Sequence, residues 1–331
     1  MSSAAISFPL LGNWSINPPN SFVLFGHTFY WYGVIIACGF LLAVAYGYHR
    51  CREFGITQDD LTDALLFAVP LAIVGARAYY VVFFGHYNSF WEMCKIWEGG
   101  LAIYGGVIAA VITVFVVCRV KKISARALLD TVAFGFLIGQ SIGRWGNFMN
   151  REAHGYETDV FCRMGLTLNG NTIYVHPTFL YESLWNALGF VGLHILSKKF
   201  KRKFDGQYFL TYLAWYGLGR VWIEGLRTDS LYIGSSAVRV SQLLAGLTCL
   251  GSILVIALVI KSGKCSPDKL WVNRLAMAEA AEAPAEAEGE AVTETETVTE
   301  TEAENEPETE TGIEIETETE PETGDTAGED V

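Results

Sequence analysis

Six ionisable residues lie inside stretches of sequence that are otherwise apolar. They are Arg77, Asp130, Arg144, Glu182, Arg220 and Glu224. At the centre of a bilayer each would cost about 2.5–3.5 kcal/mol on insertion scales, so each needs a partner or a function. Internal ion pairs would satisfy an isolated residue. Arginine, however, matches phosphate with two parallel hydrogen bonds and stays charged when desolvated, so several arginines at one depth predict an anion site.

The local spacing places polar partners beside two of these arginines. Two sets of three share the i, i+4, i+7 spacing of one helix face: Gln140, Arg144 and Asn147, and Arg220, Glu224 and Arg227. In each set a guanidinium therefore lies beside groups that can hold it in place.

The elements that must position these residues are long and apolar. Seven stretches reach the roughly 20 helical residues needed to cross a bilayer. They cover about residues 29–48, 64–84, 99–118, 127–148, 177–197, 206–226 and 240–260. Runs of this length lack the period-2 alternation of barrel strands. The sequence therefore predicts an all-α polytopic membrane protein with seven transmembrane helices.

Basic residues indicate the orientation of these helices. Fifteen of the 23 Lys and Arg residues lie in the connections after the first, third, fifth and seventh stretches. The positive-inside rule makes those connections cytoplasmic, with the N-terminus outside and the C-terminus inside. All the intramembrane charges except Asp130 then fall in the outer half of the membrane. Asp130 lies near the inner end of its stretch and is interpreted as a helix-start charge.

The net charge of −13 combines two unlike parts. Residues 279–331 hold 21 of the 36 acidic residues and no Lys or Arg, whereas residues 1–278 carry a net charge of +8. The Glu/Thr-rich segment has little apolar surface to bury, so we predict a disordered cytoplasmic tail at 279–331 after a membrane domain at 1–278. The overall acidity therefore does not indicate a basic partner or a soluble acidic enzyme. No nucleic-acid partner is expected.

The seven cysteines add little to this interpretation. Cys94 and Cys162 are expected in outer loops, where they could pair. No CxxC or HxxxH spacing suggests a metal site, and no metal is expected.

One run of residues, Gly143-Arg144-Trp145-Gly146-Asn147-Phe148-Met149-Asn150-Arg151-Glu152-Ala153-His154-Gly155, resembles the signature of the prolipoprotein diacylglyceryl transferase family. Further motifs similar to that family follow in consistent order: Trp31-Tyr32-Gly33, Gly75-Ala76-Arg77, Trp97-Glu98-Gly99-Gly100, His176-Pro177, Tyr181-Glu182, and Tyr216-Gly217-Leu218-Gly219-Arg220 with Glu224 and Arg227. The resemblance covers about residues 20–265, with seven spans and the N-terminus outside.

The resemblance implies transfer of the diacylglyceryl group of phosphatidylglycerol to the lipobox cysteine thiol of a preprolipoprotein. A thioether would form and glycerol 1-phosphate would leave, in the first step of bacterial lipoprotein maturation. The enzyme would be a multi-pass protein of the bacterial plasma membrane, with its site toward the outer leaflet. No cofactor is implied, because the phospholipid is itself the activated donor.

The resemblance also implies roles for individual residues. Arg144 and Arg220 would clamp the charge that develops on the leaving phosphate, with Asn147 as a neutral donor and Glu224 orienting Arg220. Substrate-binding roles are implied for Arg144 and for a second set of residues: Tyr32, Arg77, Glu152, Gly155, Glu182 and Arg227.

One position departs from the family pattern. Many relatives have His-Gly-Gly where this chain has Tyr104-Gly105-Gly106, and a tyrosine with a pKa near 10 is a poor base unless it is strongly shifted. Tyr104 remains a candidate catalytic residue, through a hydrogen bond to the lipid or the thiol. The arginine field can also promote ionisation of the thiol, and His154 and His176 are further candidate bases. The base therefore stays open.

A lipid or anion transporter with an outer-leaflet arginine site is the alternative function. A transporter would need a polar path across the membrane. The first, third and seventh stretches contain no charged residue, so the sequence does not provide one. An odd number of spans also gives no evident inverted repeat. The sequence therefore favours the transferase.

Overall fold

The computed structural model describes residues 5–281 apart from 13, 86, 88, 231, 233–237 and 264. The chain divides into two units, Met1–Met277 and Ala278–Val331. The predicted acidic tail lies outside the described residues from position 282 onward. The fold and the site described below belong to the first unit.

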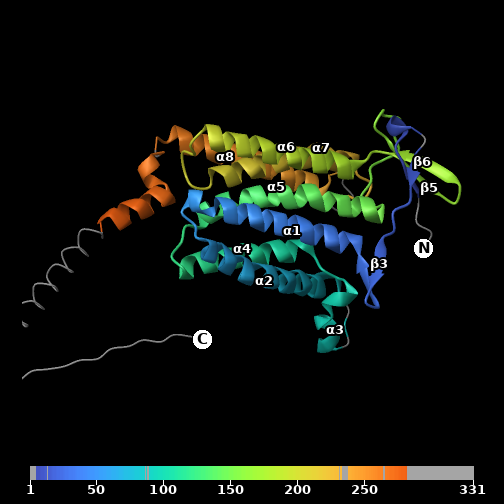
Figure 1. Ribbon diagram of the computed structural model, residues 1–331, viewed down its shortest axis with the longest axis horizontal. Coiled ribbons are helices and arrows are strands. Elements are labelled where there is room, and N and C mark those ends of the chain that lie inside the picture. Colours follow the sequence, from blue (N-terminus) through green and yellow to red (C-terminus); the bar gives the residue numbers. More distant parts are fainter. Residues whose placement is uncertain are drawn as a thin grey trace, which may run out of the picture. The chain divides into compact units, whose positions relative to one another are not determined.

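A long helix covers most of each of the seven apolar stretches (Figure 1). The helices are α1 (Trp31–Arg50), α2 (Gln58–Phe84), α4 (Ile103–Val120), α5 (Ala125–Asn150), α6 (Thr178–Lys199), α7 (Gln207–Leu226) and α8 (Val240–Lys261). Within the described part of the chain, α2, α4, α5, α8 and α1 with the turn after it are long and apolar enough to cross a membrane. The protein is thus a mostly helical, multi-pass membrane protein.

The prediction of an all-α fold is wrong in the connections, which contain short strands. The described strands are β1 (Ala5–Ser7), β2 (Ser15–Ile16), β3 (Ser21–Leu24), β4 (His27–Tyr30), β5 (Met164–Leu168) and β6 (Asn171–Val175). They form an antiparallel sheet in the order β2-β1-β5-β6 and a separate β3–β4 hairpin. Strands of two to five residues are too short to show a recognisable alternation. The end of the helices at which they lie is called the strand end (Figure 1).

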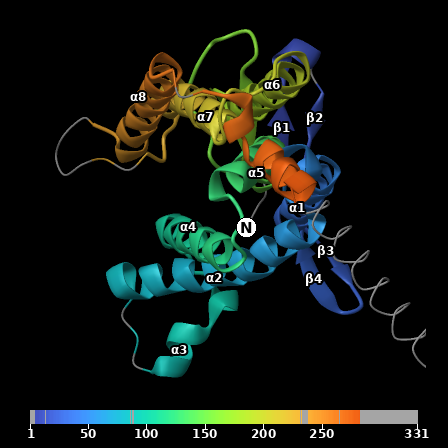
Figure 2. The ribbon, with the colours of Figure 1, turned by 90° about the vertical axis from the view of Figure 1, so that its left-hand side faces the viewer.

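The long helices run side by side in two groups (Figures 1 and 2). α5 packs against α1, α6 and α7, and α7 packs against α8, whereas α2 packs mainly against α4. One buried cluster lies away from the strand end and includes Phe54, Phe134, Leu137, Leu193 and Tyr208. A second cluster joins the sheet to the start of α6 and comprises Ile6, Met164, Leu166, Val175 and Phe179. The two clusters fix α5 and α6, which carry part of the candidate site.

The Asp130 carboxylate caps the start of a different helix from the one predicted. It is fully buried in the second turn of α5 and accepts hydrogen bonds from the backbone N–H groups of Gly206 (2.8 Å) and Phe209 (3.0 Å), at the start of α7. It also pairs with Arg202 at 3.2 Å. Its charge therefore satisfies the free N–H groups of α7 and not those of its own helix, a tertiary contact that sequence spacing does not show.

Candidate functional site

A buried carboxylate joins three arginines near the strand end of the helices. Glu182 Oε1 accepts a hydrogen bond from Arg144 Nη2 at 2.5 Å, and Oε2 accepts one from Arg220 Nη1 at 3.1 Å. Arg227 Nη1 lies 3.9 Å from the same Oε2. The Glu182 side chain is only 4% exposed. Because the partners come from α5, from α7 and from the residue after α7, one carboxylate on α6 fixes the relative positions of all three guanidinium groups.

A second carboxylate supports Arg220 from within its own helix. Glu224 Oε2 lies 2.7 Å from Arg220 Nη2, the i,i+4 contact that the spacing predicts. Glu224 is buried, and its backbone carbonyl accepts a hydrogen bond from Arg239. Arg220 is thus held between Glu182 and Glu224, with its side chain 16% exposed.

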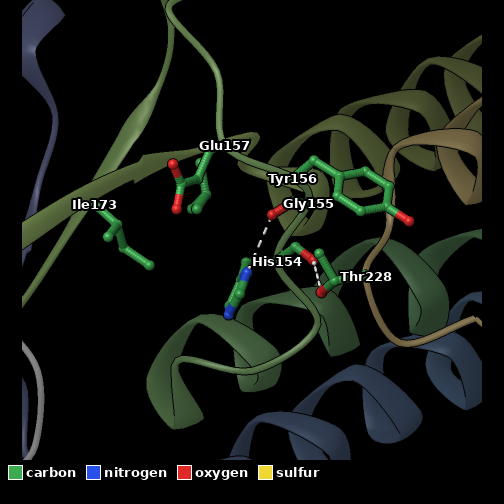
Figure 3. Close-up of a pocket in the computed structure, with 7 residues that line it drawn as sticks. His154, Gly155, Tyr156, Glu157, Ile173 and Thr228 are labelled. Atoms are coloured by element: carbon green, nitrogen blue, oxygen red, sulfur yellow. Dashed lines mark hydrogen bonds between the residues drawn. The ribbon is translucent and has the colours of Figure 1, made fainter.

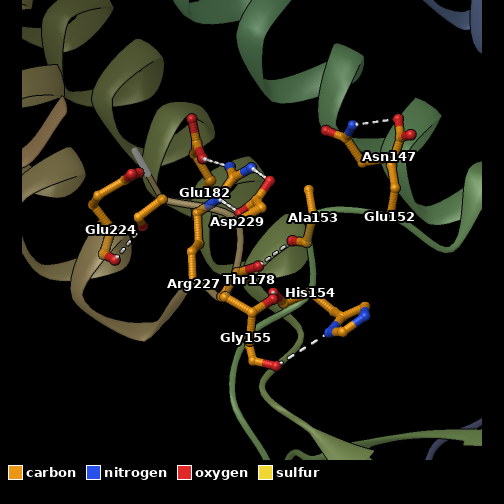
Figure 4. Close-up of polar contacts among 12 residues, drawn as sticks. Asn147, Glu152, Ala153, His154, Gly155, Thr178, Glu182, Glu224, Arg227 and Asp229 are labelled. Atoms are coloured by element: carbon orange, nitrogen blue, oxygen red, sulfur yellow. Dashed lines mark hydrogen bonds and ion pairs between the residues drawn. The ribbon is translucent and has the colours of Figure 1, made fainter. Parts of the chain in front are cut away.

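The end of α5 extends this network toward the strands. Arg144 Nη1 donates to Asn147 Oδ1 at 3.0 Å, and Asn147 Nδ2 donates to Glu152 Oε1 at 2.9 Å (Figure 4). Arg151 ends the helix in the left-handed conformation, with φ of 55°. The Glu152 N–H then donates to the Asn147 carbonyl, which turns the chain back over the helix. This helix cap is the local reason why Asn147 and Glu152 meet.

Gly155 is required by a close approach of three segments. Its N–H donates to the His176 carbonyl at 2.9 Å, and it forms an isolated antiparallel bridge with Arg227. A Cβ atom at this position would lie 2.6 Å from His176 Cβ and 2.7 Å from the Leu226 carbonyl oxygen. Only glycine fits this space, so Gly155 holds the connection after α5 against the start of α6 and the end of α7 (Figure 4).

Asp229, which was not among the predicted site residues, binds Arg227 in a bidentate way. Arg227 Nε donates to Asp229 Oδ1 at 2.9 Å and Nη2 donates to Oδ2 at 2.6 Å (Figure 4). The two hydrogen bonds from Arg227 hold the pKa of Asp229 below its ordinary value, although partial burial opposes them. α7 ends at Leu226, so Arg227 lies just beyond the predicted helix face. The only sequence signal for the pair was an acidic residue two positions after the arginine.

Six residues therefore form what we call the arginine–carboxylate cluster: Arg144, Glu182, Arg220, Glu224, Arg227 and Asp229. Three guanidinium groups face three carboxylates, so the formal charges of the cluster cancel. The side chains of Arg144 and Arg220 are 22% and 16% exposed. An anion can therefore reach two guanidinium groups whose positions are already fixed.

Arg77 is not brought to this cluster. Its guanidinium donates to four backbone carbonyls in the connection between α2 and α4, those of Glu92, Met93, Gly99 and Gly100, at 2.7–3.1 Å. Gly99 and Gly100 have φ of 89° and 70°, so α4 begins only at Ile103, later than predicted. The partners of Arg77 are thus main-chain oxygens and not the carboxylates of the cluster.

The aromatic candidates lie at helix starts. The Tyr32 ring, in the first turn of α1, packs against Gly146 of α5, where a Cβ atom would lie 2.7 Å from ring Cδ2. Tyr104 lies in the first turn of α4 and is 37% exposed. Within the described part of the chain, no hydrogen bond or ion pair joins Tyr104 to the cluster. Tyr32 is thus near the end of α5, and Tyr104 lies at the start of α4.

The remaining candidates have other partners among the described residues. His176 Nδ1 lies 3.3 Å from the Tyr181 hydroxyl, which is also 3.2 Å from Cys162 Sγ. Partial burial lowers the pKa of His176. His154 Nδ1 lies 3.2 Å from the Gly155 carbonyl oxygen. Cys94 and Cys162 are both free thiols, so the pairing that the sequence left open is not formed in this structure.

Known proteins resemble this chain over most of its length. The sequence profile of the family described as prolipoprotein diacylglyceryl transferase matches residues 19–258. Phosphatidylglycerol–prolipoprotein diacylglyceryl transferase 1 of Clostridium perfringens is 41% identical over 252 residues, which are 73% of this chain and 95% of that protein. The corresponding transferases of Oceanobacillus iheyensis and Listeria welshimeri are 45% and 46% identical over 69% and 67% of this chain, and 83% of each relative is covered.

Proposed function

We infer that this chain, which belongs to the prolipoprotein diacylglyceryl transferase family, transfers the diacylglyceryl group of phosphatidylglycerol to prolipoproteins. The observation that carries this conclusion is the match over residues 19–258, which includes the whole arginine–carboxylate cluster. The geometry of the cluster agrees with a donor whose leaving group is a phosphate ester, because guanidinium groups bind phosphate oxygens with strong, directed hydrogen bonds.

We place the reaction at this cluster. The sulfur of the lipobox cysteine attacks the glyceryl carbon that carries the phosphate, and a carbon–sulfur bond replaces the carbon–oxygen bond. The electron pair of the broken bond passes to the phosphate oxygen, and the thiol proton is taken up by the departing glycerol 1-phosphate. Arg144 and Arg220 stabilise the negative charge on this oxygen, and Asn147 adds a neutral donor beside Arg144. Both arginines are catalytic in this proposal.

The neighbouring residues hold these groups and form the substrate site. Glu224 orients Arg220, and Glu182 sets the separation of Arg144 and Arg220 through its two oxygens. Arg227 and Glu152 line the site on the side of the outer connection, which Gly155 holds in place. Tyr32 lines it from the start of α1. Arg77 shapes the site by holding the connection before α4.

We propose that all seven long helices cross the membrane. At 1.5 Å per residue, the 22 residues of α6 and the 20 of α7 are about 30 Å long, enough to span the hydrocarbon core. The positions of the basic residues favour an N-terminus outside and a C-terminus in the cytoplasm of a bacterial cell, with the cluster toward the outer leaflet of the plasma membrane. The transferase unit occupies residues 1–278, and truncation after residue 278 preserves activity.

Tyr104 is proposed to hydrogen-bond the lipid or the acceptor thiol. Replacing Tyr104 with Phe removes only the hydroxyl. If the hydroxyl acts in the reaction, kcat falls in the Tyr104→Phe variant while the thermal midpoint stays unchanged. Full turnover by this variant would eliminate a chemical role for Tyr104.

The function is tested with purified protein, phosphatidylglycerol vesicles and a lipobox peptide. We expect diacylglyceryl-peptide and glycerol 1-phosphate in equal amounts, detected by mass spectrometry. Arg144→Ala and Arg220→Ala each abolish product. Arg119→Ala is the matched control, because Arg119 is exposed in the last turn of α4, and it retains the wild-type rate. Near-normal rates in either cluster variant would contradict the placement of the reaction, and no product from the wild-type chain would contradict the function.

A further inference from the structure

A pocket of about 450 Å³ opens beside the arginine–carboxylate cluster but is lined by none of its residues (Figure 3). Its walls come from the connection after α5, from β6 and from the residue after Arg227. The lining residues are His154, Gly155, Tyr156, Glu157, Ile173, Val175 and Thr228. Ile173 is 43% exposed, so the pocket presents apolar surface that the fold does not bury.

The pocket and the cluster share one piece of backbone. Thr228 directly follows Arg227 in the chain, and its hydroxyl donates to the His154 carbonyl at 3.2 Å. The Tyr156 N–H donates to the Leu226 carbonyl at 2.9 Å, on the other side of Arg227. A ligand seated in the pocket therefore lies against the same short segment that carries one arginine of the cluster. An extended peptide can therefore occupy the pocket and reach the cluster at the same time.

The charges of the lining residues favour the prolipoprotein over the phospholipid as the ligand of this pocket. None of its seven lining residues is Lys or Arg, and Glu157 contributes an exposed carboxylate. A phosphate group in this pocket would meet that carboxylate and no Lys or Arg among the lining residues, so an anionic lipid or a released phosphate ester is disfavoured. Apolar walls with a few polar groups suit the side chains of a peptide. Figure 3 shows the Glu157 and Ile173 side chains near the same space, which places the carboxylate within reach of such a peptide.

We propose that this pocket binds the residues of the prolipoprotein that directly follow the acceptor cysteine, while the thiol reaches the arginine–carboxylate cluster. This inference rests on the proposed function. Glu157 then gives the enzyme a preference for a basic residue over an acidic one at these positions. The pocket thus contributes to the selection of the protein substrate and not of the lipid.

The test uses two lipobox peptides that differ only in the two residues after the cysteine, which are Lys in one and Asp in the other. With wild-type protein and phosphatidylglycerol vesicles, we expect kcat/KM to be about fivefold higher for the Lys peptide, the size of an exposed charge interaction. Glu157→Gln removes this preference and Glu157→Lys reverses it, and the KM for phosphatidylglycerol stays unchanged in both. Asp159→Lys is the matched control, because Asp159 is an exposed carboxylate of the same connection that does not line the pocket. It keeps the wild-type preference.

Three other outcomes would overturn the proposal, and a fourth would overturn the proposed function instead. Equal kcat/KM for the two peptides with the wild-type chain would overturn the proposal. So would a reversal of the same size in Asp159→Lys, since the effect would then come from the general surface charge. A lower KM for phosphatidylglycerol in Glu157→Lys, with the peptide preference intact, would also overturn it and assign the pocket to lipid. If the wild-type chain modifies neither peptide, the proposed function fails instead.

Discussion

Glu182→Gln is the substitution that most directly tests how the cluster works. The change keeps the shape of the side chain but removes the charge that faces three guanidinium groups at 2.5, 3.1 and 3.9 Å. Removing one partner of a buried ion pair costs about 3–5 kcal/mol. The partner arginines are 22%, 16% and 10% exposed, so solvent screens them little. Because Gln retains one acceptor oxygen, we take the lower end of the range, about 3 kcal/mol.

If Glu182 sets the separation of Arg144 and Arg220, most of this energy is lost from the transition state. A loss of about 3 kcal/mol corresponds to about two orders of magnitude in kcat/KM. The assay is diacylglyceryl-peptide formation with phosphatidylglycerol vesicles and a lipobox peptide. The matched control is Glu224→Gln, which loses the ion pair with Arg220 at 2.7 Å and is expected to lose less activity. A Glu182→Gln enzyme within about threefold of wild type would refute this reasoning.

Three further substitutions test a neighbour of the cluster, the capped start of α7 and the Arg227–Asp229 pair. Gly155→Ala places a methyl group 2.7 Å from the Leu226 carbonyl oxygen, so activity and the thermal midpoint both fall. Gly192→Ala is the control, because its added Cβ meets no atom within 4 Å, and it leaves both unchanged. Asp130→Ala removes the acceptor for two N–H groups at the start of α7 and the partner of buried Arg202. The free energy of unfolding therefore falls by about 3–5 kcal/mol, which is measured as a lower thermal midpoint in detergent. Asp229 has its pKa lowered by Arg227, so its stabilisation is present above the ordinary carboxyl pKa and is lost as the pH falls through the lowered value. The thermal midpoint of Asp229→Asn therefore depends less on pH across the acid range than that of wild type, and identical pH profiles would contradict the pairing.

The long helices could be predicted because their apolar length is a strong signal, but their ends depend on polar chemistry. α2 begins at Gln58, six residues before the predicted 64, because Thr57 and Asp60 form a capping box. α4 begins late because two glycines before it adopt positive φ. Hydropathy reports neither effect, since capping residues are polar and glycine is nearly neutral.

Individual pairs within the candidate site could be predicted from spacing only where both partners lie on one helix, whereas shared depth correctly brought Glu182 to Arg144 and Arg220. The i,i+4 spacing correctly paired Arg220 with Glu224, and the i,i+3 spacing paired Arg144 with Asn147. Depth alone also placed Arg77 with the other arginines, although its guanidinium donates to backbone carbonyls. Depth reports the distance along the membrane normal and not the direction in which a side chain points. Asp229 was missed for a different reason, because a single acidic residue in a connection is too weak a signal to indicate a pair.

The charge balance of the cluster bears on how it favours reaction over binding. With three carboxylates facing three guanidinium groups, a neutral cluster gains little from a phosphodiester that carries a single negative charge. In the proposed reaction, additional charge develops on the phosphate oxygen as the carbon–oxygen bond breaks, and only then would Arg144 and Arg220 gain a stronger partner than the carboxylates they already contact. An interaction that strengthens between the ground state and the transition state accelerates the chemical step, whereas one of equal strength in both states only tightens substrate binding. In this proposal the carboxylates therefore hold the arginines in place and also limit how strongly the donor lipid is bound before it reacts.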